Sequence, residues 1–289
     1  MSLKIVVLAK QVPDTRNVGK DAMTPEGTVN RAALPAIFNP EDLNALEQAL
    51  RLKDQNPGST VSVLTMGPPR ATEVIREGLY RGADNGYLLT DRAFAGADTL
   101  ATSYALSMAI KKIGNVDLVI GGRQAIDGDT AQVGPQVAEK LGLNQVTYVE
   151  EVLDCNNKEI TAKRHIDGGV ETVVAPLPCV LTVNGSADAC RPRNAKLVMK
   201  YKRAMAPMEM PAELPYKEEY EKKAYLTVTQ WSVADVDGDL AQCGLAGSPT
   251  KVKAVQNIVF KAKESKQIGA SDSEVEGLII ELLNSHTIG

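Results

Sequence analysis

The first half of the chain alternates short apolar runs with stretches of helical periodicity, and this alternation restricts the fold more than any other feature. Each apolar run is bounded by turn-forming or polar residues, as expected of parallel strands buried on both faces of a sheet. Strands that alternate with helices form a parallel sheet through right-handed crossovers. We therefore predict a doubly wound α/β fold with a mostly parallel sheet. The expected strands are Leu3–Ala9, Val61–Met66, Gly86–Leu89 and Val116–Ile120.

Helix-start and helix-stop residues between these runs predict four helices. Asn39 is expected to cap the first, because Pro40 occupies its first position and two acidic residues follow. Asp98 is expected to cap the third, and glycines stop the second and the fourth. The expected helices begin at Pro40, after Pro69, at Thr99 and at about Thr130, and the last three end near Gly82, Lys112 and Leu141.

The sequence changes in character after residue 145. Four β-prone segments separated by turn-forming residues predict an antiparallel extension of the sheet. We take residues 1–190 together as a Rossmann-like α/β domain that binds a nucleotide or a flavin. The β-prone segments are Val146–Leu153, Glu159–Arg164, Val170–Val174 and Val180–Val183.

Beyond residue 190 the chain turns basic and is then interrupted by prolines, so that no single helix can cover this part. We expect residues 191–235 to form an extended excursion along a surface, with a flexible linker as the alternative. Residues 236–289 are expected to form a C-terminal arm with a helix near Glu274–Asn284. So long an extension, partly apolar and interrupted by prolines, is typical of a segment that wraps a partner chain.

Composition argues against several functions. A net charge of −4 and an aromatic content of 4% provide neither a basic surface nor many stacking side chains for nucleic acid. Two histidines, and four cysteines without a CxxC pair, disfavour a metal site, a dithiol centre or a catalytic triad. No apolar run reaches the roughly 18 residues of a membrane span. We therefore expect a cytoplasmic protein without a membrane partner, whose chemistry comes from a bound cofactor.

The most informative segment is the Gly- and Asp-rich loop Gly121–Gln136, which reads GGRQAIDGDTAQVGPQ. It follows an expected strand and leads into a helix, so it lies at the carboxyl edge of the sheet, where open α/β folds bind ligands. Its glycines let the backbone approach a ligand, and the amides near Thr130–Gln132 would face an anion such as a phosphate. Arg123 adds a fixed positive charge. An ordinary strand–helix turn is the alternative.

Three further loops are expected at the same edge: Ala9–Asp14, Met66–Pro69 and Ala95–Thr99. Helix N-termini that converge there would form a cradle for a diphosphate. Neither GxGxxG after the first strand nor GxxxxGK[ST] is present, which argues against a standard dinucleotide dehydrogenase or a P-loop NTPase. Asp235–Asp239 resembles a calcium loop without its glycine and glutamate, and we expect a turn there.

Together these motifs resemble the β (small) subunit of electron transfer flavoproteins. The resemblance rests on the loop Gly122–Val133, and it extends from Lys10–Asp14 through Asn39–Asp42 to Gly168-Gly169, essentially the whole chain. It implies a partner α (large) subunit that carries an electron-transferring FAD. It also implies a nucleotide in the β subunit, which is AMP in ordinary carriers. In the electron-bifurcating branch a second FAD takes that place and accepts hydride from NADH.

Asp91–Thr99, Gly128–Pro135 and Leu245–Thr250 are similar to the bifurcating branch. A Gly-Ala-Asp-Thr loop at a helix N-terminus also leaves room for a diphosphate. The resemblance thus implies FAD in the β site and NADH as donor, with one electron passing to ferredoxin and the other through the α-subunit FAD to a flavin-dependent dehydrogenase. Two alternatives remain: a carrier subunit with structural AMP, and a stand-alone regulatory domain that binds an adenine nucleotide. The longer Pro- and Met-rich stretch at residues 204–216 departs from a typical β subunit.

The resemblance also implies roles for individual residues. Arg123 is the candidate for stabilising a reduced, anionic flavin, with a phosphate or carboxylate clamp as the alternative. Leu197 is the expected apolar anchor for the partner dehydrogenase. No metal ligand is expected. The residues expected to bind the cofactor are Ala9, Asn39, Asp42, Met66, Asp98, Thr99, Gly122, Arg123, Gln124, Ala125, Ile126, Asp127, Gly128, Asp129, Thr130, Ala131, Gln132 and Val133.

Overall fold

The computed structural model describes residues 2–14, 35–156, 158–213, 216–251, 265–285 and 287–288. The described residues up to 251 belong to one compact unit, and those from 265 onward belong to a second. Parts of the expected excursion (residues 214–215) and of the expected arm (residues 252–264) lie outside the described residues.

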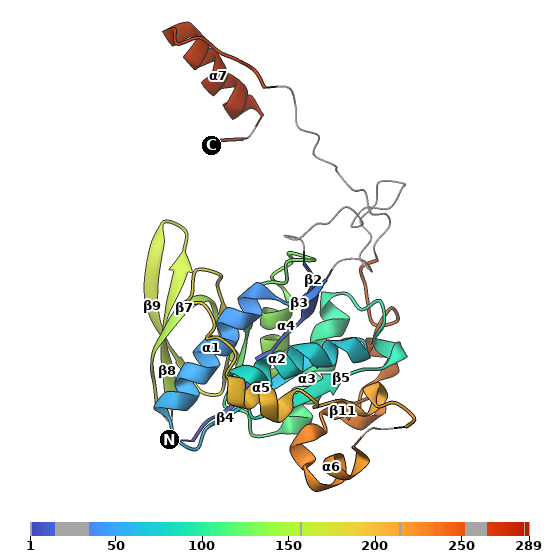
Figure 1. Ribbon diagram of the computed structural model, residues 1–289. Coiled ribbons are helices and arrows are strands. Elements are labelled where there is room, and N and C mark those ends of the chain that lie inside the picture. Colours follow the sequence, from blue (N-terminus) through green and yellow to red (C-terminus); the bar gives the residue numbers. More distant parts are fainter. Residues whose placement is uncertain are drawn as a thin grey trace. The chain divides into compact units, whose positions relative to one another are not determined.

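The first unit is built on a nine-stranded sheet of order β11-β5-β4-β1-β6-β10-β7-β8-β9 (Figure 1). Every pair from β11 to β7 is parallel, which confirms the predicted mostly parallel sheet. The strands of this part are short and largely buried, as the apolar runs predict. Their bounds are β1 Lys4–Leu8, β4 Thr60–Met66, β5 Asn85–Leu89, β6 Leu118–Gly122, β10 Cys179–Val183 and β11 Thr229–Trp231.

Helices cover both faces of this sheet, so the doubly wound prediction is confirmed. Helices α1 (Pro40–Gln55) and α2 (Thr72–Arg81) bury leucine, alanine, valine and isoleucine side chains in one apolar cluster with the sheet. Helices α3 (Thr99–Ile113) and α4 (Val133–Leu141) contribute to a second cluster on the opposite face. Gly82 ends α2 as expected, with a φ of +124° that favours glycine.

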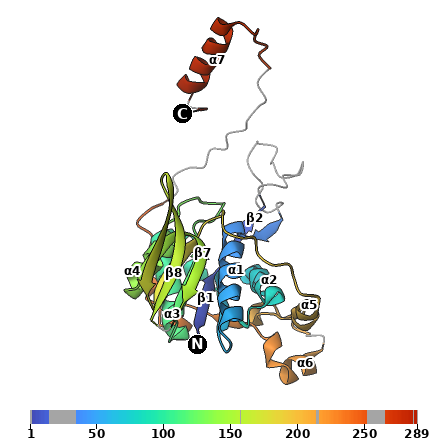
Figure 2. The same ribbon diagram turned by 90° about the vertical axis from the view of Figure 1, so that its left-hand side faces the viewer.

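The antiparallel extension consists of β7 (Asn144–Cys155), β8 (Glu159–Ile166) and β9 (Gly169–Pro176), which lie together in Figure 2. The fourth expected segment, Val180–Val183, was wrongly placed in it. It belongs to β10, which lies between β6 and β7 and runs parallel to both. The reason is burial: all five residues of β10 are buried, a pattern that fits a central parallel strand and not a half-exposed hairpin.

The described residues of 191–213 and 216–251 form short elements of the first unit. Two short helices, α5 (Ala195–Tyr201) and α6 (Lys217–Lys222), precede β11, which pairs with β5 at the edge of the sheet. In the second unit, α7 (Asp272–Asn284) is the expected C-terminal helix. The remaining elements are β2 Gln11–Pro13, β3 Ala36–Phe38, and the 3₁₀ turns η2 Pro69–Ala71, η3 Arg92–Phe94, η4 Pro207–Glu209, η5 Ala224–Leu226, η6 Ala234–Val236 and η7 Leu240–Gln242.

The fourth helix begins three residues later than predicted, at Val133 instead of Thr130. Asp129 and Ala131 have φ values of +48° and +52°. This left-handed conformation is incompatible with a right-handed helix. Thr130–Gln132 therefore belongs to the loop and not to the helix.

Candidate functional site

The carboxyl ends of three neighbouring parallel strands place three of the expected site residues side by side. β1 lies between β4 and β6, and these strands lead directly to Ala9, Met66 and Gly122. Ala9 is buried, and its amide donates a hydrogen bond of 3.0 Å to the Leu64 carbonyl. The loop after β6 thus stands at the edge where ligands of open α/β sheets bind.

Asn39 stands at the N-cap position of α1 as predicted, but its side chain makes no capping hydrogen bond there. Its side-chain amide donates to the Gln124 carbonyl at 2.9 Å, and its Oδ1 accepts from the Ile126 amide at 3.2 Å. The loop offers backbone groups that need partners, and a fully buried Asn39 satisfies one donor and one acceptor at once. Its role is to hold the loop against the start of α1.

The two acidic residues in the first turn of α1 hold the same loop. Glu41 accepts from Arg123 Nη2 at 3.0 Å and from the Gln124 amide at 2.9 Å. Asp42 accepts from the Lys10 amide at 2.8 Å and from the Gly122 amide at 3.0 Å. Glu41 was not among the predicted site residues, although its place in the motif Asn39–Asp42 was a signal.

Burial makes Asp42 an unusual carboxyl group. Burial raises its pKa from 3.8 to about 7, and the nearby Glu41 carboxylate acts in the same direction. Hydrogen bonds from Asn39, Lys10 and Gly122 lower the pKa but do not offset the burial. Asp42 therefore changes charge near neutral pH, directly beneath the loop.

Arg123 is held between two elements. Its guanidinium pairs with Glu41, and it lies over the ring of Tyr148 at 5.5 Å from the ring centroid. Hydrogen bonding to Glu41 raises the pKa of Arg123, so its charge is permanent. Tyr148 has a φ of +58°, a strained conformation for an aromatic residue. The carboxylate partner of Arg123 in this chain is thus Glu41.

We expect Glu41→Gln to lower the free energy of unfolding by about 1.5 kcal/mol, because Arg123 loses its charged acceptor while Gln124 keeps an amide oxygen. Urea denaturation checks this value. The matched control is Glu218→Gln, which removes an exposed ion pair with Lys222 on α6 and should change little. Equal effects of the two substitutions would show that the Glu41–Arg123 pair contributes no more than a surface ion pair.

The remainder of the loop forms a turn with its own contacts. The amides of Gly128 and Asp129 donate to the Ala125 carbonyl at 3.2 and 2.9 Å, and Gln124 Nε2 donates to Asp129 Oδ1 at 2.9 Å. Lys10 pairs with Asp127 at 2.7 Å. Residues 128–130 are exposed, so the tip of the loop is accessible to a ligand.

Asp98 caps α3 as predicted. Its Oδ1 accepts from the Leu100 and Ala101 amides, both at 3.0 Å. Burial acts to raise the pKa of Asp98, but hydrogen bonds from Ala101, Thr250 and Leu100 hold it below its ordinary value. This N-terminus therefore carries a carboxylate already, which disfavours a phosphate there. By contrast, Gln132 makes no side-chain cap on α4, so the amides after the loop suit an anion better.

Thr99 links α3 to the loop. Its hydroxyl donates to Gln132 Oε1 at 2.9 Å and accepts from Gln136 Nε2 at 3.4 Å. The oxygen of Gln136 is buried without a partner among the described residues, and so is the hydroxyl of Thr65, one residue before Met66. A buried polar atom without a partner costs about 1–3 kcal/mol. Gln48 Nε2 on α1 and Arg81 Nε at the end of α2 are in the same state away from this edge, so these atoms do not by themselves mark a ligand site.

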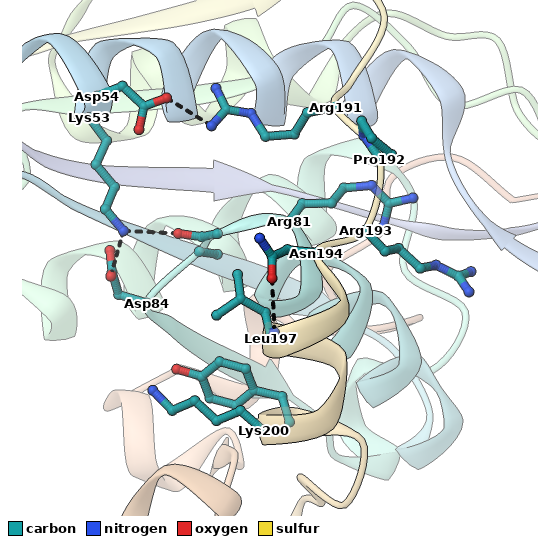
Figure 3. A pocket seen from close by; sticks show the side chains of 13 residues that line it. Lys53, Asp54, Arg81, Asp84, Arg191, Pro192, Arg193, Asn194, Leu197 and Lys200 are labelled. Atoms are coloured by element: carbon teal, nitrogen blue, oxygen red, sulfur yellow. Dashed lines mark hydrogen bonds and ion pairs between the residues drawn. The ribbon is translucent and has the colours of Figure 1, made fainter.

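Leu197 lies elsewhere, on α5, half-buried beside a hollow of about 610 Å³ (Figure 3). Gly82–Asp84 line this hollow and precede β5, so it lies toward the amino edge of the sheet, opposite to the loop. Of its cations, Lys53 pairs with Asp84 at 2.6 Å and Arg191 with Asp54 at 2.8 Å. The structure thus separates the expected partner anchor from the expected cofactor residues.

Residues 26–210 match the family described as the electron transfer flavoprotein domain. The chain belongs to the electron transfer flavoprotein family. A caffeyl-CoA reductase–Etf complex subunit, CarD, from Acetobacterium woodii is 42% identical over 287 residues, covering 99% of this chain and 100% of that protein. An electron transfer flavoprotein subunit β from Clostridium acetobutylicum is 45% identical over 251 residues (87% of this chain, 86% of that protein). Protein FixA from Sinorhizobium fredii is 40% identical over 290 residues (98% and 93%).

These relatives identify the chain as a β-type subunit of the family, with a role in electron transfer. Within the described ranges, no three His, Cys, Asp or Glu side chains are grouped so that they could hold a metal ion. None of the helices in the described part of the chain is long and apolar enough to cross a membrane.

Proposed function

We propose that this chain is the β subunit of an electron-bifurcating electron transfer flavoprotein, with FAD in the site formed by the β6–α4 loop. NADH is the donor, and the partners are an α subunit, ferredoxin and a flavin-dependent dehydrogenase. The single observation that carries the proposal is the loop itself. Three side chains of the α1 start, Asn39, Glu41 and Asp42, fix its backbone, while its tip remains exposed. Such a preorganised edge suits a bound nucleotide cofactor.

The names of the relatives support the family part of the proposal. CarD is a subunit of a caffeyl-CoA reductase–Etf complex, so that protein assembles with a reductase. Of the segments that resemble the bifurcating branch, Gly128–Pro135 covers the tip of the loop and the start of α4, and Leu245–Thr250 contacts the start of α3. Both are placed where they can affect a ligand at this edge.

In the proposed site, the residues of this chain would bind and orient the cofactor. A bound flavin would accept a hydride and pass on single electrons. The loop amides and the N-terminus of α4 would hold phosphate, and Ala9 and Met66 would line the edge. Arg123, fixed by Glu41 and Tyr148, would place a permanent positive charge beside the ligand.

AMP is the second candidate ligand, and one observation favours it. Among the described residues, the two cations that contact the loop, Arg123 and Lys10, already have carboxylate partners, Glu41 and Asp127. A diphosphate would therefore depend on backbone amides for most of its charge compensation, whereas a single phosphate needs fewer donors. In this case the chain would be a carrier subunit without a redox centre of its own.

The surface of the second unit supports the proposal of a large partner chain. Within the second unit α7 buries no residue: Val275, Ile279, Ile280 and Leu283 are exposed, and Leu278 and Leu282 are half-buried. Exposed apolar residues at helical spacing mark a surface that another protein covers. We assign this surface to the α subunit, and the half-buried Leu197 to the dehydrogenase.

Co-expression with the α subunit tests the proposal. The purified heterodimer is expected to contain two FAD per dimer and to lose flavin absorbance rapidly when NADH is added. Flavin and AMP released by acid are counted by chromatography. One FAD with one AMP and no response to NADH would establish the carrier alternative, and a β chain without any nucleotide would contradict both.

A further inference from the structure

Residues 243–250, here called the strap, lie directly on the segment that leads into α3. A Cβ atom on Gly244 would come within 2.2 Å of the Ala93 carbonyl oxygen, and one on Gly96 within 2.6 Å of Leu245 Cγ. Cys243 is buried in the same apolar cluster as Phe94. The backbone of Gly244 therefore lies directly against the Ala93 and Ala95 carbonyls, and the Leu245 side chain covers Gly96.

Two hydroxyl groups connect the strap to Asp98. The Ser248 hydroxyl is buried, accepts from the Asp98 amide at 2.8 Å and donates to the Gly244 carbonyl at 2.6 Å. Thr250 donates to Asp98 Oδ2 twice, from its hydroxyl at 2.7 Å and from its amide at 3.1 Å. One carboxylate thus caps α3 with one oxygen and holds the strap with the other.

The residue after Asp98 reaches the loop. Thr99 donates to Gln132 at 2.9 Å, and Gln136, with its unpaired oxygen, donates to Thr99. A continuous series of hydrogen bonds therefore leads from Thr250 through the Asp98–Thr99 backbone to the last loop residue before α4. A shift of the strap would be transmitted to the ligand edge, because α3 and the loop share this contact.

We infer that Ser248 and Thr250 are positioning residues for the nucleotide site: they fix the positions of Asp98 and Thr99 relative to Gln132. This inference rests on the proposed function, since it needs a nucleotide at the loop. The Thr250 hydroxyl acts through Asp98, which accepts its hydrogen bond. The strap therefore determines nucleotide affinity, although it lies far along the chain from the loop.

The test uses the heterodimer with the α subunit, stripped of its β-site nucleotide and titrated with AMP and with FAD. Thr250→Val keeps the side-chain volume and removes the hydroxyl donor, and we expect the dissociation constant to rise about tenfold. Thr250→Ser should restore it. The matched control is Thr172→Val on the exposed side of β9, which should leave the dissociation constant unchanged.

A purely structural role of the strap would lower the melting temperature of the nucleotide-free Thr250→Val protein without changing its dissociation constant. That result, in a wild type that binds nucleotide, would overturn this inference alone. A wild-type heterodimer that binds neither AMP nor FAD at the β site would overturn the proposed function and the inference with it.

Discussion

Replacing Gly122 by alanine is expected to weaken binding of the β-site nucleotide about a hundredfold and to destabilise the fold by about 2–3 kcal/mol. A Cβ atom at this position would lie 2.5 Å from Asp42 Oδ1, 2.7 Å from the Glu41 carbonyl carbon and 2.8 Å from the Asp42 amide nitrogen. Two of these atoms are backbone atoms of the first turn of α1, which cannot move without moving the helix. The loop would have to separate from α1 instead.

That separation would break the hydrogen bonds that give the loop its shape. The Gly122 amide would lose Asp42, and the contacts of Glu41 with Arg123 and Gln124 would lengthen. Each lost bond to a carboxylate contributes about 1.5–3 kcal/mol. Nucleotide content per heterodimer and the dissociation constant for AMP or FAD measure the effect, with urea denaturation for stability.

Gly128 provides a matched control within the same loop. No atom lies within 4 Å of a Cβ built there, and its φ is not in the left-handed region. Gly128→Ala should therefore leave the free energy of unfolding close to the wild-type value. If Gly128→Ala lowered the free energy of unfolding as much as Gly122→Ala does, the flexibility of the loop would explain the destabilisation. The close approach of Gly122 to α1 would then not explain it.

The sequence predicted the features that depend on local pattern. The apolar runs gave the four parallel strands, Pro40 and Gly82 gave helix ends, and Asp98 was correctly expected to cap α3. The Gly- and Asp-rich loop follows an expected strand and precedes an expected helix, and its position at the carboxyl edge was predicted from this placement. Each of these inferences needs only residues that are near one another in the chain.

The predictions that were wrong concern features that depend on contacts between residues far apart in the chain. Asn39 has the residue type and position of a helix cap, but loop groups more than eighty residues away take its side chain. Val180–Val183 looks like one more hairpin strand, and only its insertion between β6 and β7 makes it central. The strap contact between Thr250 and Asp98 spans 152 residues, and no periodicity or spacing predicts such a contact.

Asp42 leads to the second prediction, which concerns pH. Its pKa is about 7 in the folded chain and 3.8 as an ordinary side chain, so the folded state binds an extra proton between these values. The wild type therefore loses stability as pH rises through this range, by up to about 1.4 kcal/mol per pH unit. Asp42→Asn has no proton to exchange and lacks this loss. We expect the destabilisation caused by Asp42→Asn to be about 2–3 kcal/mol smaller at pH 8 than at pH 5.

Urea denaturation of wild type and variant at both pH values measures this difference, and the comparison cancels contributions from groups that the two proteins share. Asp188→Asn is the control, because this carboxyl group is exposed and, among the described residues, pairs only with Arg51 at the surface. Its effect should be the same at both pH values. A penalty for Asp42→Asn that did not change with pH would mean that the amides of Lys10 and Gly122 compensate the burial, and that Asp42 stays ionised beneath the loop. A penalty that is smaller at pH 8 than at pH 5 would mean that Asp42, next to the proposed phosphate site, loses its negative charge as the pH drops below 7.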